Sequence, residues 1–370
     1  MKILFVSRLF HDVSGGVERM AIVLMNELHA RGHEVELLSW DTADATTFYP
    51  LDLGVVWHKL DMGDARKRAG WRLRLGRQTS IRRLVRRIRP DVMIAFQHGP
   101  FITVALATAG LGIPVIAAER NAPQRFDHLR AGRHRWLIFP TFCLAERITL
   151  QWNDYIAGYP PYLRSRIVSI PNPVPPAKTT ADTYGDPDTT KRLLSVGRLS
   201  YQKNQSVLIE AFALLADSHP RWRLTLVGAG EDESRLKLLS VTRGLGDRVD
   251  FVGATTDVER AYLDSHLFCL PSRWEGFPNA MAEAMAHGLP AVGFSGCAGV
   301  AQLIDDGVTG RLAPGNGSVD TLADALRSLM DDDEGRARMG RAAVLAMARY
   351  EPAAVFDRWV KLFREVTASR

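Results

Sequence analysis

The chain has 370 residues, of which 46% are hydrophobic and 24% are charged, and its formal net charge is +6. This composition is ordinary for a globular protein and excludes a disordered or fibrous chain. The length predicts two domains, because one hydrophobic core rarely grows to this size. The three cysteines show no C-x-x-C spacing, so neither a disulfide framework nor a zinc ribbon is expected.

Apolar segments that are typical of buried strands alternate with amphipathic helical stretches along the chain. In the first half the predicted strands are 3–7, 34–40, 55–60, 92–96, 115–118 and 167–170, with a helix over 18–31. In the second half they are 192–196, 224–227, 249–252, 267–270, 291–293 and 310–312. This alternation favours an α/β fold of two Rossmann-like domains, each with a parallel sheet covered on both faces.

The first strand is too short for a signal peptide, and the uncharged stretch 92–118 is interrupted by glycine and proline. We therefore expect no transmembrane segment.

A cationic segment lies between Asp64 and Pro90, where eleven Lys and Arg residues face a single acid. Residues 1–176 hold 24 Lys and Arg against 15 Asp and Glu, so the positive charge belongs to the first half. Apolar residues interleave with the cations, which predicts one or two amphipathic helices on an anionic membrane or acceptor. The alternative is a solvated basic helix whose apolar side packs on the sheet. The residues expected to face lipid are Arg66, Lys67, Arg68, Trp71, Arg72, Arg74 and Arg77.

Nucleic acid is the competing partner for such a patch, but the chain has no zinc-ligand spacing and no aromatic RNA platform sequence. We therefore expect no nucleic-acid partner.

A proline-rich stretch at 170–176, followed by polar residues at 179–190, predicts an interdomain linker. We expect a first domain over 1–172, a linker over 173–190 and a second domain over 191–351. The final helix, within 352–370, carries Phe356, Trp359, Val360 and Phe363 at helical spacing. It packs either on the second domain or back on the first.

The segment Glu275-Gly-Phe-Pro-Asn-Ala-Met-Ala-Glu283 places two carboxylates eight residues apart, across a loop that runs into a helix. If the helix begins near Pro278, Glu275 lies beside its N-terminal amides and Glu283 lies more than one turn inside it. N-terminal amides and the helix dipole attract anions. A carboxylate on each side can accept hydrogen bonds from hydroxyl groups, which suits a sugar nucleotide.

At these residues the chain resembles the E-x7-E retaining glycosyltransferases of family 4, which have the two-domain GT-B fold. The likeness covers nearly the whole chain. Its other markers are Gly15-Gly16-Val17-Glu18-Arg19, Ser195-Val-Gly-Arg198-Leu with Lys203-Asn204, Leu226-Val-Gly-Ala-Gly230 and Val249-Asp-Phe-Val-Gly253. In this fold the last helix crosses back onto the N-terminal, acceptor-binding domain.

The resemblance implies roles for named residues. Glu275 orients the hexose, Glu283 binds the nucleotide ribose, and Arg198 and Lys203 stabilise the departing diphosphate. Catalytic roles fall on Glu275, Arg198, Lys203 and Glu119. The donor-binding set is Gly15, Gly16, Arg198, Lys203, Gly228, Val252, Gly276, Phe277, Pro278, Asn279 and Glu283.

The acceptor side is expected at His98, Glu119, Arg120 and Asn121, which follow predicted strands at their carboxyl ends. Glu119-Arg120-Asn121-Ala-Pro123 is similar to the S-E-R-N-D-P loop of bacterial galactosyl- and N-acetylhexosaminyltransferases, with Ala118 and Ala122 departing from it. Glu119 then positions or deprotonates the acceptor hydroxyl, with Arg120 near a phosphate. Each residue also has a plain structural interpretation, as a salt-bridged loop pair or a hydrogen-bonding histidine.

The expected function is transfer of a hexose or N-acetylhexosamine from a nucleotide sugar, with uridine as the favoured base, to a glycan or a polyprenyl-diphosphate-linked acceptor. The resemblance implies same-face attack. We expect no metal and no other cofactor, because neither D-x-D pattern, Asp186-Pro-Asp188 or Asp331-Asp-Asp333, follows an apolar strand. The expected location is cytoplasmic, at the inner face of the membrane. The alternatives are a GDP-mannose-dependent mannosyltransferase, a sugar-nucleotide epimerase of the same fold and a non-catalytic glycan-binding protein.

Overall fold

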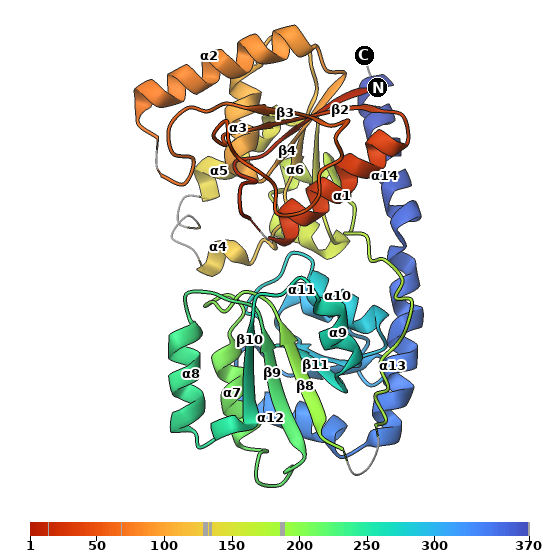
Figure 1. Cartoon of the computed structure of the whole chain (residues 1–370). Helices are drawn as coiled ribbons and strands as arrows, with labels where there is room; N and C mark the ends of the chain where they lie inside the picture. The colour runs from red at the N-terminus through yellow and green to blue at the C-terminus, as the bar shows by residue number, and fades with distance from the viewer. Residues whose placement is uncertain (14, 68, 129–131, 133–134, 186–188, 369–370) are drawn as a thin grey trace. The chain divides into compact units, whose positions relative to one another are not determined.

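The computed structural model describes residues 1–13, 15–67, 69–128, 132, 135–185 and 189–368. It consists of two compact units (Figure 1). Unit 1 comprises Met1–Pro173 together with Ala353–Arg370, and unit 2 comprises Val174–Pro352.

Unit 1 contains a parallel sheet whose strands follow in the order β3-β2-β1-β4-β5-β6-β7. The strands are β1 (Lys2–Val6), β2 (Glu34–Ser39), β3 (Val56–Lys59), β4 (Val92–Phe96), β5 (Val115–Ala118), β6 (Arg147–Leu150) and β7 (Ile167–Ser169). The longer helices are α1 (Gly16–Ala30), α2 (Trp71–Ile88), α3 (His98–Ala107) and α14 (Pro352–Ala368). Shorter ones are α4 (Arg125–His128), α5 (Arg135–Thr141), η2 (Phe142–Leu144), η3 (Asn153–Gly158) and α6 (Pro161–Arg164).

The sheet of unit 1 is apolar on both faces, as a parallel sheet between helical layers must be. Alternate residues such as Ile3 and Phe5 join α1 and α14 in one hydrophobic core. On the other side α3 packs on β4 and β5, and α2 packs on α3. Trp359 of α14 is fully buried in the core and stacks on Phe363, so the last helix of the chain is an integral part of unit 1.

Unit 2 contains a second parallel sheet, in the order β10-β9-β8-β11-β12-β13. Its strands are β8 (Lys191–Val196), β9 (Trp222–Val227), β10 (Val249–Gly253), β11 (Leu267–Leu270), β12 (Ala291–Phe294) and β13 (Gly310–Ala313). Its helices are α7 (Gln205–Ala213), α8 (Glu233–Thr242), α9 (Val258–Leu263), α10 (Asn279–Ala286), α11 (Ala298–Ala301), α12 (Val319–Met330) and α13 (Asp333–Met347), with η4 (Gly246–Arg248) and η5 (Ala348–Tyr350). Helix α7 packs against α8 and α12, and α10 packs against α13, so helices lie on both faces of the sheet (Figure 1).

The prediction of two Rossmann-like parallel sheets is confirmed, and one strand was missed. Strand β6 lies between β5 and β7 inside the sheet, but its sequence Arg-Ile-Thr-Leu has only two strongly apolar residues and begins with a charge. Among the described residues, no helix combines the length and the apolar character needed to cross a membrane.

Candidate active site

Two of the predicted catalytic residues lie in loops of unit 2 that are neighbours because of the strand order in the sheet. Strand β8 pairs with β11, so the loops that follow their carboxyl ends run side by side. Lys203 lies in the first loop and Glu275 in the second. Lys203 Nζ donates to Glu275 Oε1 at 2.6 Å, and the Glu275 side chain is only 6% exposed.

The two loops are joined by further hydrogen bonds that fix this pair. Asn204 adopts a left-handed backbone conformation with φ 57° and donates from Nδ2 to the Pro271 carbonyl. The Arg273 guanidinium donates to Asn204 Oδ1 at 2.8 Å, and Gln202 Nε2 donates to the Trp274 carbonyl at 2.9 Å. The pair is therefore held by a rigid scaffold of the kind that catalytic groups require.

Glu283 lies in α10, which begins at Asn279, directly after the buried residues Gly276, Phe277 and Pro278. The helix therefore starts one residue after the position expected from the sequence. Pro278 has no side chain that can cap the helix amides. The Tyr262 hydroxyl donates to Glu283 Oε2 at 3.2 Å.

Three further residues of unit 2 were predicted to bind the donor. Arg198 is exposed after β8, and its side chain has no ion-pair partner in the described part of the chain, so its charge faces solvent. Gly228 follows β9 at φ 135°, where an added Cβ would lie 2.1 Å from the Gly197 carbonyl oxygen, so only glycine fits. Val252 lies on the edge strand β10, two strands away from β8, and the structure does not bring it to the Lys203–Glu275 pair.

The acceptor-side residues meet at the carboxyl ends of β4 and β5 in unit 1. Glu119 is 4% exposed, and its Oε1 has no hydrogen-bond partner among the described residues. Burial raises the pKa of Glu119 to about 7, although Arg125 and the backbone amide of His98 favour the charged form. Burial and the charge of Glu119 also raise the pKa of Tyr159 well above its usual value.

His98 is held in one tautomer by Thr141. Burial lowers the pKa of His98, so the neutral ring is favoured. Thr141 Oγ1 donates its only proton to the Ile138 carbonyl at 2.6 Å, so the 2.9 Å contact with His98 requires that Nε2 carries the ring proton. His98 Nδ1 is then a hydrogen-bond acceptor, which suits a ligand hydroxyl.

The structure gives Arg120 a different role from the predicted phosphate contact. This residue is 4% exposed, donates to the Ile170 carbonyl and to Asn172 Oδ1, and lies over the Trp359 ring. Burial lowers its pKa to about 9. Arg120 therefore ties β5 to the core of unit 1, while its neighbour Asn121 is half-buried.

Gly15 and Gly16 stand at the start of α1, where Gly15 is the N-cap and Gly16 the first helical residue. A Cβ at Gly15 would lie 2.2 Å from Glu18 Oε2, so the acid of the first turn occupies the space that a side chain would need.

The expected lipid-facing residues form two sets. Arg66, Lys67, Trp71, Arg72 and Arg74 are exposed, and Trp71 is 71% exposed at the start of α2. Arg77 is a correction, because it is 6% exposed and donates twice to the Met62 carbonyl. Arg68 lies outside the described residues.

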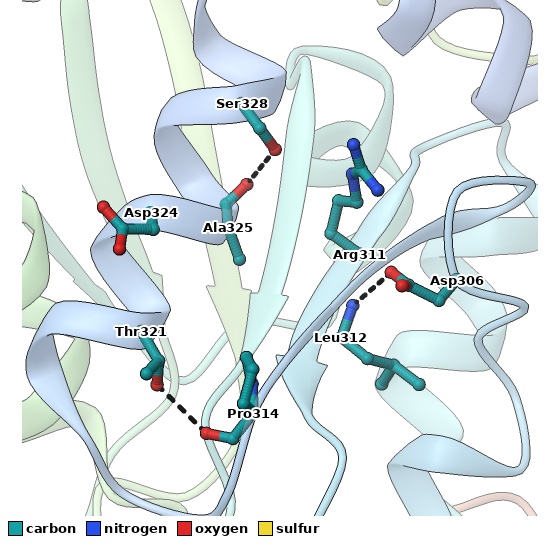
Figure 2. Close-up of a pocket in the computed structure, with 8 residues that line it drawn as sticks. All are labelled: Asp306, Arg311, Leu312, Pro314, Thr321, Asp324, Ala325 and Ser328. Atoms are coloured by element: carbon teal, nitrogen blue, oxygen red, sulfur yellow. Dashed lines mark hydrogen bonds between the residues drawn. The ribbon is translucent and has the colours of Figure 1, made fainter.

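A pocket of about 330 Å³ lies between β13 and α12 in unit 2 and contains none of the expected site residues (Figure 2). Its lining residues are Asp306, Arg311, Leu312, Pro314, Thr321, Asp324, Ala325 and Ser328. The Thr321 and Ser328 hydroxyls donate to carbonyls of the protein itself, so these groups have no proton left for a ligand. The chemistry of the Lys203–Glu275 region makes it the better candidate.

No cluster of three His, Cys, Asp or Glu residues that could bind a metal ion occurs in the described ranges. Of the two D-x-D patterns, Asp186 to Asp188 lie outside those ranges.

Sequence reasoning missed the residues that hold the site together. Tyr262 stands 21 positions before Glu283, Arg273 donates to the Asn204 side chain, and Gln202 donates to a backbone carbonyl. No spacing rule identifies them, because their partners become neighbours only when the sheet forms.

Comparisons with known proteins identify the family of the chain. Residues 14–178 match the family model described as Glycosyltransferase Family 4, and residues 178–345 match that of Glycosyl transferases group 1. A Haemophilus influenzae protein described as an uncharacterized glycosyltransferase is 27% identical and covers 94% of this chain and 95% of its own length. An alpha-1,4-N-acetyl-D-galactosaminyltransferase of Campylobacter jejuni, named for a diNAcBac-PP-undecaprenol glycan, is 24% identical over 99% of both chains.

Solved structures are similar to this fold over nearly the whole chain. A sucrose-phosphate synthase from Thermosynechococcus elongatus superimposes with a TM-score of 0.82 at 17% identity, covering 100% of both chains. HepE from Anabaena, solved in complex with UDP, gives a TM-score of 0.76 at 17% identity, covering 99% of this chain and 100% of its own.

Proposed function

The chain belongs to the glycosyltransferases of the GT-B fold and family 4 type, and on this premise we propose that it transfers a hexose or N-acetylhexosamine from a UDP-linked donor to a glycan or polyprenyl-diphosphate-linked acceptor. The GT-B fold class and the assignment to the transferase enzymes are confirmed. The proposed role is assembly of a bacterial polysaccharide or glycan.

The observation that carries the proposal is the Lys203–Glu275 pair, in loops that follow adjacent strands, with α10 and Glu283 directly after. The Lys203 ammonium thus contacts the segment 275–283, which contains two carboxylates and the N-terminus of α10. In the proposed complex, Arg198 and Lys203 bind the diphosphate, Glu275 binds hexose hydroxyls and Glu283 binds the ribose. Fixed charges aimed at the leaving group provide the main stabilisation of the transition state.

The proposed reaction retains the anomeric configuration. The acceptor hydroxyl oxygen forms a bond to the anomeric carbon on the face from which the diphosphate departs, and the bond between that carbon and the phosphate oxygen breaks. The hydroxyl proton passes to the departing phosphate. Glu119 and His98 position the acceptor by accepting its hydroxyl hydrogen bonds.

Uridine is proposed as the base because the Glu119-Arg120-Asn121 loop is similar to that of galactosyl- and N-acetylhexosaminyltransferases, and because HepE binds UDP. A GDP-mannose-dependent mannosyltransferase is the alternative. An epimerase or a binding-only protein is less favoured, because neither function requires groups such as Glu119 and His98 to position an acceptor hydroxyl.

A lipid-linked acceptor is proposed because the exposed part of α2 and the residues before it carry positive charge and Trp71. Such a surface fits the anionic inner face of a membrane, where each basic residue contributes about 1 kcal/mol. The name of the Campylobacter jejuni relative also refers to an undecaprenol-linked acceptor.

The proposal is tested by thermal-shift and hydrolysis measurements on the purified protein. The donors are UDP-glucose, UDP-galactose, their N-acetyl forms and GDP-mannose, each with and without EDTA. We expect one UDP sugar to raise the melting temperature, EDTA to have no effect, and Glu283→Ala to abolish the shift. Stabilisation by GDP-mannose alone would select the mannosyltransferase, and a strict metal requirement would contradict the proposed mechanism.

A further inference from the structure

The carboxylate of Glu283 is held by a residue outside the donor motif. Tyr262, in α9, is 2% exposed, and its hydroxyl donates to Glu283 Oε2 at 3.2 Å. A phenol hydroxyl has one proton, and a hydrogen bond donated to a carboxylate favours the ionised form. Tyr262 therefore holds the Glu283 side chain in one rotamer.

The Tyr262 ring has little freedom to leave this position. Its centroid lies 6.3 Å from the Phe268 ring of β11 and 5.0 Å from the His287 ring at the end of α10. His287 Nδ1 donates to the Glu283 carbonyl at 2.7 Å, so the histidine is bound to the same residue whose side chain the tyrosine holds. The side chain and the backbone of Glu283 are thus each hydrogen-bonded to one of two neighbouring rings, Tyr262 and His287.

We infer that Tyr262 is a positioning residue for recognition of the nucleotide ribose. This inference rests on the proposed function, in which Glu283 accepts hydrogen bonds from the ribose hydroxyls. A glutamate has several rotatable bonds, and a free one would lose rotamer entropy when the ribose binds. Because Tyr262 fixes the carboxylate before the donor arrives, this rotamer entropy is lost when the protein folds and not when the ribose binds.

The test compares UDP with its 2′,3′-dideoxyribose analogue in wild-type protein and in Tyr262→Phe. Phenylalanine preserves the ring contacts and removes only the hydroxyl. We expect UDP to bind about tenfold more weakly to the variant, the size of effect given by one lost hydrogen bond to a charged group. Binding of the dideoxy analogue should be unchanged. In assays, the KM for the donor should rise with kcat preserved.

A merely structural role would weaken both ligands equally and lower the melting temperature, and this result would overturn the inference. Tyr155→Phe removes a hydroxyl from another buried tyrosine, in unit 1, and serves as the matched control. Glu283→Ala supplies a second variant, which removes the carboxylate and leaves the Tyr262 ring in place. In the double variant, loss of the tyrosine hydroxyl should add no further weakening, because its partner carboxylate is already absent.

Failure of the inference is distinguishable from failure of the proposed function. If wild-type protein binds neither UDP nor GDP, the proposed function fails. If Glu283→Ala loses discrimination between UDP and the dideoxy analogue while Tyr262→Phe keeps it, the inference fails and the proposed function stands.

Discussion

The Lys203 ammonium and the Glu275 carboxylate neutralise each other in a largely buried position, and this pairing determines what each does in catalysis. Two opposite charges in a buried position stabilise each other, but removal of one leaves the other charge buried without a partner. In the proposed complex, the diphosphate adds negative charge beside Lys203. The ammonium then has two anionic partners, and Glu275 Oε1 becomes available to hexose hydroxyls.

Glu275→Gln should therefore reduce kcat by at least about 100-fold, the usual cost of losing one preorganised electrostatic group. The amide oxygen can still accept from Lys203, so the fold should persist. Measurement of kcat with the donor selected by the screen, together with the melting temperature, checks both expectations. Full activity in this variant would remove Glu275 from the site.

The ionisation of Glu119 gives a pH prediction. Its pKa of about 7 in the folded chain lies above the ordinary value of 4.5, so the folded state binds the proton more tightly. The free energy of unfolding should fall as pH rises from about 4.5 to about 7. Acceptor positioning needs the carboxylate, so kcat/KM for the acceptor should rise with pH through about 7.

The pH profile of Glu119→Gln should lack this rising limb and show lower activity. Measurements from pH 5.5 to 8.5 on both proteins compare the two curves. A rising limb of the same midpoint in the variant would assign it to another group.

Sequence reasoning could place Lys203, Glu275 and Glu119 after the carboxyl ends of strands and Glu283 inside a helix, because motif spacing and apolar runs locate those ends. It could not foresee that Arg120 is buried. Whether a cation faces solvent or binds inside the core depends on its partners. Those of Arg120 include Asn172 and Trp359, which lie far from it in the sequence.

At the scale of elements, helix α2 shows how one amphipathic sequence serves two surfaces. Arg77, Ile81, Val85 and Ile88 form its buried side, while Trp71, Arg72 and Arg74 are exposed. The sequence identified the helix and its charge. It assigned Arg77 to the wrong side, because a long cationic side chain at a buried position can donate hydrogen bonds to a nearby carbonyl, here that of Met62.

Substitution of Arg72 and Arg74 by glutamine should weaken binding to vesicles that contain anionic lipid. With about 1 kcal/mol lost per charge, the two changes should lower the partition coefficient by about 30-fold. Arg235→Gln with Lys237→Gln, on α8 of unit 2, removes two other exposed charges and should have no effect. Equal losses in both double variants would indicate that net charge alone, and not α2, attracts the lipid.

At the scale of the whole molecule, the chain forms unit 1, passes through unit 2 and returns to unit 1 with α14. Alternating strands and helices predicted both sheets, since each parallel strand needs a crossover. The order of strands did not follow from the sequence. The order depends on which strand each crossover connection places beside which neighbour, and the apolar pattern does not specify this.

This connectivity predicts that the two units respond differently to damage in the last helix. Trp359 is fully buried against Phe363 and Arg120, so Trp359→Ala should destabilise unit 1 by about 3–5 kcal/mol. Unit 2 has its own core and holds Glu283, so its amides should still be protected by UDP. Hydrogen exchange with and without UDP, read separately for peptides of residues 1–173 and 174–352, measures both effects. Leu345→Ala, at an exposed position of α13, is the control and should change neither unit. If Trp359→Ala removes UDP protection from unit 2 as well, the units do not fold independently and α14 stabilises both.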